Sequence, residues 1–268
     1  MAHHLDVYAC TNRLRCISPQ QKLWFAIATL LIALMAQIST QLLIVLWLAV
    51  WTVGYARIPI KVYLQVLMAA GLFLVTSLLA LVLNLVSIEQ MVSVQQDQVG
   101  GVAIANGYLW VSRSGLVQAL QIGMRSIACT SCLLFVLLTT PFTDLLQVLR
   151  QWRVPVLLTE LLLLMYRFIF LLLAVMTELQ LAQRARGGYR TRQRWIYSVG
   201  LLVSQLLVRS LQHYQHFSLA LAARGFNGSF RVEAGQSYFY SKRYAIEAIV
   251  GCVGLIILEL KIRLFPGV

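Results

Sequence analysis

The sequence predicts an all-α membrane protein with about five transmembrane helices and with long cytoplasmic helices inserted before the last span. Of its 268 residues, 60% are hydrophobic and only 12% are charged, about half the charged share of a soluble domain. Several apolar stretches are long enough to cross a hydrocarbon core of about 30 Å. Lysine and arginine total 22 against nine acidic residues, and they gather between these stretches, as in proteins that keep basic loops in the cytosol.

Three regions follow from the apolar pattern. Residues 1–139 are predicted to hold N-terminal transmembrane helices, residues 140–231 a cytoplasmic helical region, and residues 232–268 a C-terminal transmembrane helix. The first two spans almost touch at Ser39-Thr40-Gln41, which indicates a tight hairpin or a re-entrant pair. The predicted spans cover residues 23–39, 41–56, 64–87, 115–139 and 244–260.

Basic residues set the predicted orientation, because cytosolic loops carry an excess of lysine and arginine. An even alternation of spans with a cytosolic N-terminus places three basic groups in the cytosol: Arg13, Arg15 and Lys22; Arg57 and Lys61; and Arg150 and Arg153. The loop over residues 88–114 then lies outside, and its paired glycines and alternating polar residues are consistent with a short hairpin.

The segment 156–176 is long and apolar enough to span a membrane, but its charged neighbours argue against that. If it crossed, the arginines of residues 184–194 would lie outside while Arg150 and Arg153 lay inside, which inverts the usual bias. It also carries Glu160 and Arg167, an expensive pair for a helix surrounded by lipid. We therefore predict a helix that lies along the cytosolic interface or against another subunit, preceded by a short amphipathic helix over residues 142–152.

A repeated tripeptide is the most informative motif of the chain. Ala185-Arg186-Gly187 and Ala223-Arg224-Gly225 each close a long predicted helix, and Gly188 and Gly228 follow. A glycine suits the left-handed residue that ends a helix, and an arginine in the last turn is favoured by the partial negative charge there. We expect each guanidinium to be exposed between small neighbours.

These residues resemble a known family, the transmembrane T component of energy-coupling-factor transporters, of the CbiQ cobalt-transport type. The resemblance runs from about Leu23 onward and rests on Thr139-Thr140-Pro141-Phe142-Thr143-Asp144-Leu145-Leu146, on the long apolar helix over residues 156–183, and on the two Ala-Arg-Gly motifs. It implies that the long cytoplasmic helices are coupling helices. It also implies that Arg186 and Arg224, flanked by Ala185, Gly187, Ala223 and Gly225, dock on two cytosolic ABC-type ATPase subunits.

The resemblance further implies a substrate-binding membrane subunit of the CbiM kind as a partner, a place in the inner (plasma) membrane, and cobalt or nickel as the transported ion. It implies no enzyme activity in this chain, no cofactor and no nucleic-acid partner. The sequence agrees in lacking the Gly-x-x-x-x-Gly-Lys-Ser/Thr loop of nucleotide-binding proteins, so ATP would be hydrolysed by a partner. Without the resemblance, the arginines can equally be read as anchors at anionic headgroups.

Other candidate sites are weaker. Cys129 and Cys132 have the spacing of a redox or metal pair, but they lie within an apolar helix and are read as small packing residues. His213 and His216 lie one turn apart without a third ligand nearby in the sequence. Three alternative functions stay open: a T component for vitamins, a membrane enzyme acting on lipid headgroups, and a structural scaffold with no transport role.

Overall fold

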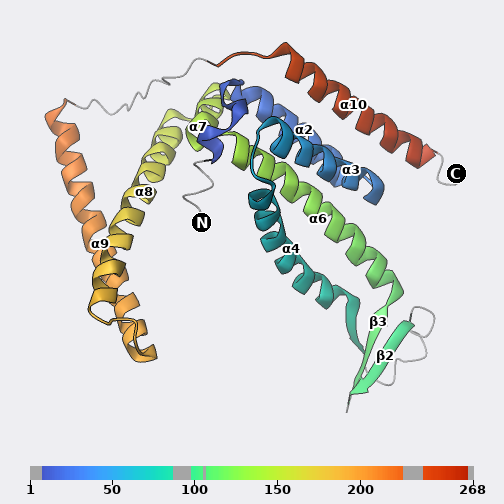
Figure 1. Ribbon diagram of the computed structural model, residues 1–268, viewed down its shortest axis with the longest axis horizontal. Coiled ribbons are helices and arrows are strands. Elements are labelled where there is room, and N and C mark those ends of the chain that lie inside the picture. The colour runs from blue at the N-terminus through green and yellow to red at the C-terminus, as the bar shows by residue number, and fades with distance from the viewer. Residues whose placement is uncertain (1–7, 87–97, 105–106, 226–237, 265–268) are drawn as a thin grey trace. The chain divides into compact units, whose positions relative to one another are not determined.

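The computed structural model describes residues 8–86, 98–104, 107–225 and 238–264 (Figure 1). Helices make up most of this part of the chain, which confirms the predicted fold class. The chain divides into two compact units. The first unit comprises residues 1–145 and 236–268, and the second comprises residues 146–235.

The first unit is a helical bundle around one central helix. A short 3-10 turn at Arg13–Cys16 is followed by five longer elements, and α2, α3 and α4 all pack against α6 (Figure 1). The elements are α2 (Pro19–Met35), α3 (Ile38–Ala49) continued by a π-helical turn, η2 (Val50–Tyr55), α4 (Ile60–Val82), α6 (Arg113–Thr139) and α10 (Lys242–Leu264).

An aromatic cluster forms the core of this bundle. The ring centroid of Phe25 in α2 lies 5.0 Å from that of Trp47, 4.9 Å from that of Trp51 and 5.3 Å from that of Phe135 in α6. The start of α2 therefore lies beside the end of α3, which confirms the predicted hairpin. Cys132 is buried in the same cluster as a free thiol, in agreement with its interpretation as a packing residue.

Between α4 and α6 in the sequence, the chain forms a small antiparallel sheet. Its strands are β1 (Leu83–Val86), β2 (Gln98–Ile104) and β3 (Gly107–Ser112), in the order β1-β3-β2. The predicted short hairpin is thus present as β2 and β3. The predicted C-terminal limit of the third span, residue 87, was wrong. The helix α4 stops at Val82, because the next four residues form a strand that pairs with Tyr108–Val111. Residues 87–97 lie outside the described part of the chain, and the side of the membrane on which the sheet lies stays a prediction.

The boundary between the first two helices also differs from the prediction. The helix breaks at Ala36 and Gln37, and the polar triplet beginning at Ser39 forms the first turns of α3. The Gln41 amide nitrogen donates to the carbonyl oxygens of Ala33 (3.2 Å) and Ala36 (2.9 Å). Gln41 therefore satisfies carbonyls at the end of α2, which lack partners within their own helix.

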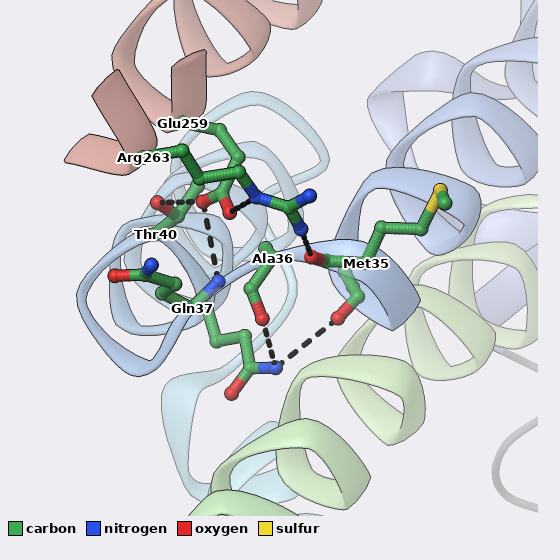
Figure 2. A network of polar contacts seen from close by, with 8 residues as sticks. Met35, Ala36, Gln37, Thr40, Glu259 and Arg263 are labelled. Atoms are coloured by element: carbon green, nitrogen blue, oxygen red, sulfur yellow. Dashed lines mark hydrogen bonds and ion pairs between the residues drawn. The ribbon is translucent and has the colours of Figure 1, made fainter. Parts of the chain in front are cut away.

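A buried carboxylate from α10 completes this break (Figure 2). Glu259 Oε2 accepts hydrogen bonds from Thr40 Oγ1 (2.8 Å) and from the Gln37 backbone N–H (3.2 Å), while its Oε1 accepts from Arg263 Nε (3.0 Å). Arg263 also donates to the Met35 carbonyl oxygen. A charged pair from one helix thus satisfies backbone groups at the ends of two others.

Close packing holds α10 against α3. Gly251 lies so near the Trp47 indole that a Cβ atom at this position would overlap the ring. Small residues permit such close approach between helices in a membrane, where packing replaces the hydrophobic effect as the force for association.

Four helical segments among the described residues are long and apolar enough to cross a membrane: Ile38–Tyr55, Ile60–Val82, Gly115–Thr139 and Val156–Ala185. Three correspond to predicted spans. The helices α2 and α10 do not meet this criterion: α2 has 17 residues, and α10 carries charged residues near both of its ends. The chain is a multi-pass membrane protein, and the crossing of α2 and α10 stays a prediction.

The Glu259 network gives a prediction about the stability of the bundle. Glu259→Ala removes the acceptor of three hydrogen bonds and leaves Arg263 without its carboxylate, so we expect a loss of about 2–3 kcal/mol in the free energy of unfolding. Thermal unfolding of the purified protein in detergent measures the loss. Lys261→Ala, at an exposed position two residues away, is the control and should change stability by less than about 0.5 kcal/mol. Equal effects of the two variants would contradict a specific role for Glu259.

Candidate functional site

The second unit consists mainly of two long antiparallel helices, α8 (Val156–Ala185) and α9 (Arg192–Ala223). Three side-chain contacts define their register. The Gln183 amide nitrogen donates to the Ser198 carbonyl oxygen (3.1 Å), and Glu178 and Arg209 lie 3.6 Å apart. The rings of Phe168 and Phe217 meet edge to face with centroids 6.0 Å apart. In these three pairs, a lower residue number in α8 goes with a higher residue number in α9, so the helices run in opposite directions. Figure 1 shows that they cross.

The first Ala-Arg-Gly motif ends α8 with a complete Schellman cap. Arg186 is the last residue near helical geometry (φ −87°, ψ 7°), and Gly187 is left-handed (φ 69°). The Gly188 N–H donates to the Gln183 carbonyl oxygen at 2.9 Å, and the Gly187 N–H donates to the Arg184 carbonyl oxygen at 3.0 Å. These are the two hydrogen bonds that define the motif.

The second motif repeats this backbone conformation at the end of α9. Arg224 has φ −91° and ψ 7°, Gly225 has φ 67°, and the Gly225 N–H donates to the Ala222 carbonyl oxygen at 3.1 Å. The prediction of a left-handed glycine after each arginine is confirmed at both sites. Gly228, predicted to follow the second motif, lies outside the described residues.

The turn after the first motif is fixed by contacts that the sequence did not indicate. Ser198 Oγ donates to the Gly188 carbonyl oxygen (2.8 Å), and the Tyr189 hydroxyl donates to Gln183 Oε1 (2.6 Å). A Cβ atom at Gly188 would lie 2.7 Å from Ser198 Oγ and 3.0 Å from the Gln183 carbonyl oxygen. Gly188 is therefore required by the close approach of α9.

The two arginines lie at opposite ends of the helix pair. Arg186 lies next to the turn where Gly188 meets Ser198, whereas Arg224 follows the far end of α9. Ser198 and Arg224 are 26 positions apart, which corresponds to about 40 Å at 1.5 Å per residue. Both side chains are exposed. A single small ligand cannot contact both, so the pair suits two separate contacts on larger partners.

A row of exposed apolar side chains runs along α8. Leu157, Leu161, Met165, Ile169 and Leu173 recur every four residues and are exposed by 36–76%. Such spacing places them on one face of the helix. This row, which we call the α8 stripe, is the kind of large apolar surface that indicates contact with lipid or another protein.

The charged residues near the start of α8 are arranged differently from the sequence interpretation. Glu160 lies 3.9 Å from Arg150 of the preceding helix α7 (Phe142–Gln151), whereas Arg167 is exposed. Glu160 is thus partly neutralised by a residue of the neighbouring helix rather than by Arg167 two turns away.

The remaining candidate residues are the two histidines of α9. His213 is half-buried and His216 is exposed on α9. Among the described residues, no group of three or more His, Cys, Asp or Glu is placed to hold a metal ion.

Asp144, in the Thr139–Leu146 motif, is a buried residue whose partner the sequence did not reveal. Its Oδ1 accepts a hydrogen bond from the Tyr238 hydroxyl at 2.7 Å. Burial and this hydrogen bond to the carboxylate raise the pKa of Tyr238. The contact joins positions separated by 94 residues, so no local pattern could have indicated it.

Residues 11–238 match the profile of a family described as cobalt transport protein, CbiQ. The chain belongs to the CbiQ cobalt transport protein family. The match covers both helix-end motifs and the Thr139–Leu146 motif, and it confirms the family resemblance seen in the sequence.

Curated relatives agree with this family. The cobalt transport protein CbiQ of Rhodobacter capsulatus is 41% identical over 118 residues, which are 44% of this chain and 48% of that protein. This match therefore spans about half of the relative's length. The cobalt transport protein CbiQ of Salmonella typhimurium is 27% identical over 218 residues, 74% of this chain and 94% of that protein. A putative fused cobalt transport protein, CbiMQ, of Methanocorpusculum labreanum is 25% identical over 227 residues, 84% of this chain and 37% of that protein.

The cap geometry gives a prediction about the first motif. Gly187→Ala puts a Cβ atom on a left-handed residue, which costs about 1–2 kcal/mol. We expect faster amide hydrogen exchange in the last turn of α8, because the cap opens more often. Gly225→Ala should do the same at the end of α9.

Gly200→Ala is the matched control, since Gly200 lies inside α9 with open space around it. Alanine is favoured over glycine there by about 0.5–1 kcal/mol, so exchange should be unchanged or slower. If the three variants exchange alike, the left-handed glycines do not hold the helix ends.

Proposed function

We propose that this chain is the energy-coupling membrane subunit of an energy-coupling-factor importer, and that Arg186 and Arg224 dock on two cytosolic ATPase subunits. The observation that carries the proposal is the repeated cap. Two exposed arginines have the same backbone conformation, and each precedes a left-handed glycine. They lie at opposite ends of one antiparallel helix pair. An importer with two ATPases needs two equivalent contacts at a distance from each other.

Arginine is suited to this contact for a physical reason. Its planar guanidinium can bind a carboxylate or carbonyl groups through two parallel hydrogen bonds, which the ammonium of lysine does not reproduce. The left-handed glycine satisfies the helix-end carbonyls through the backbone, so the arginine is not needed to cap its own helix. Each guanidinium therefore stays available to a partner.

The α8 stripe is proposed to bind the substrate-binding membrane subunit. A helix this apolar, exposed along one face, gains stability when a partner covers it. The fused relative named CbiMQ supports a partner of the CbiM kind, and the family supports cobalt, or chemically similar nickel, as the transported ion. ATP hydrolysis then belongs to the ATPases, and this chain transmits their movement.

We place the complex in the inner (plasma) membrane, with residues 151–195 on the cytosolic side. Although α8 is long and apolar enough to cross a membrane, crossing would separate Arg150 and Arg153 from the arginines that follow α8. The bias of basic residues toward the cytosol favours keeping them together.

Charge reversal tests the docking proposal. Arg186→Glu or Arg224→Glu should leave membrane insertion unchanged and abolish transport, because loss of a buried charged partner costs about 2–5 kcal/mol. The double variant should fail to retain the ATPases on membranes. Cobalt uptake by cells and copurification of the ATPases with the tagged chain are the two measurements.

Arg190→Glu and Arg192→Glu serve as matched controls, since Arg190 in the turn and Arg192 at the start of α9 are both exposed but lie outside the motifs. Each should retain most of the ATPase. If all four substitutions reduced binding equally, the effect would come from general cytosolic charge, and the proposal of two specific contacts would fail.

The α8 stripe is tested by replacing Leu157, Leu161 and Met165 together with serine. This triple variant should release the substrate-binding subunit and keep the ATPases, because it removes apolar contact area and leaves both arginines in place. Leu157→Met, Leu161→Met and Met165→Leu, made together, preserve volume and apolarity and should keep the whole complex. Retention of the substrate-binding subunit by the serine variant would assign this surface to another role.

A further inference from the structure

A basic pocket opens on the first unit. It has a volume of about 190 Å³ and lies between the chain before α2 and the turn before α4. Its polar lining includes Tyr8, Thr11, Arg13 and Arg57. Both arginines are exposed. The pocket therefore offers two guanidiniums to one ligand.

The backbone around the pocket is fixed by hydrogen bonds. The Arg13 N–H donates to the Ala56 carbonyl oxygen at 3.4 Å, which joins the two lining segments. Asn12 is buried, and its amide nitrogen donates to the carbonyl oxygens of Leu138 (3.2 Å) and Thr139 (3.1 Å) at the end of α6. The two arginines thus project from segments that are anchored to each other and to the central helix.

Arg57 has a left-handed backbone, with φ 56°. This conformation costs a residue with a side chain roughly 1–2 kcal/mol, and glycine would adopt it without that cost. Strained residues of this kind cluster at functional sites, where the surrounding structure holds them in place. The strained backbone of Arg57, a residue that lines the pocket, therefore supports a binding role for it.

The charge of the pocket favours an anion. Within the part of the chain that the structure describes, neither Arg13 nor Arg57 takes part in an ion pair with a carboxylate. Arg13 also borders a neighbouring hollow with Arg243, whose own charge is matched by Glu247 at 3.0 Å. Two arginines that line one pocket and form none of these ion pairs suit a phosphate group, which accepts paired hydrogen bonds from guanidinium.

An apolar track begins next to this pocket. Ile60, Leu64, Met68 and Leu72 recur every four residues along α4, and they are exposed by 43–74%. Ile60 follows Arg57 by three residues, so the track starts at the pocket and continues along a helix that is long enough to span a membrane. A ligand with a phosphate at one end and hydrocarbon chains at the other fits both features.

We propose that Arg13 and Arg57 bind the phosphate of an anionic phospholipid, whose acyl chains lie along α4. Basic pockets at the cytosolic ends of membrane helices are suited to such headgroups. A bound lipid would hold the segment before α2 to the turn before α4. The pocket is independent of the arginines proposed to dock the ATPases, so either proposal can fail without the other.

The test is thermal unfolding of the purified chain in a nonionic detergent during three titrations. Dioctanoyl phosphatidylglycerol should raise the melting temperature and saturate, whereas dioctanoyl phosphatidylcholine and inorganic phosphate at the same concentrations should not. In the Arg13→Ala/Arg57→Gly variant, the apparent affinity for phosphatidylglycerol should fall about thirtyfold, since a basic residue near an anionic lipid contributes about fivefold. If that variant does not purify, Arg13→Gln alone should show about a fivefold loss.

Arg153→Gly is the matched control. Arg153 is also left-handed, with φ 61°, and it does not line the pocket, so this variant should keep the full response. An equal response to phosphatidylcholine would show that acyl chains alone are bound. An equal response to inorganic phosphate would assign the pocket to a free anion. Either result overturns the proposal, as would an unchanged affinity in the pocket variants or an equal loss in Arg153→Gly.

Discussion

The need to satisfy backbone hydrogen bonds at helix ends governs the first unit. The last carbonyl groups and the first N–H groups of a helix have no partners within that helix, so a buried helix end requires partners from elsewhere in the protein. The break between α2 and α3 is satisfied by Gln41, Glu259 and Arg263. The end of α6 is satisfied by Asn12 and by Lys22, whose Nζ donates to the Thr139 carbonyl oxygen at 3.0 Å. In both places, the side chains that satisfy the backbone also join helices that are distant in sequence.

The second unit meets the same need in the opposite way. Its two long helices end in glycine caps, in which backbone N–H groups donate to carbonyl oxygens of the last turn. The arginine before each glycine is exposed. At its helix ends the first unit thus uses Lys22, Glu259 and Arg263 to join helices, whereas the capped helix ends of the second leave Arg186 and Arg224 exposed. This difference is what supports a partner-binding role for Arg186 and Arg224.

The sequence predicted features that depend on local chemistry and missed those that depend on distant contacts. The left-handed glycines followed from the Ala-Arg-Gly motif, and most apolar helices followed from their length. The break at Ala36 was missed because the groups that satisfy it include Glu259, more than 200 residues away. The strand beginning at Leu83 was missed because it exists only by pairing with β3. For the candidate site, the motif gave the residues, but the antiparallel register that separates the two arginines required the structure.

That register constrains how movement can pass through the second unit. Contacts between Gln183 and Ser198, and between Phe168 and Phe217, occur along much of α8, so a force applied at one motif reaches the other helix through packed side chains. The α8 stripe lies on the same helix, between its start and the first motif. If the two arginines follow two ATPases, as we propose, a change in the distance between the ATPases must rotate or shear α8 against α9, because helices of fixed length cannot stretch to follow it. A partner covering the stripe would then be tilted by that movement.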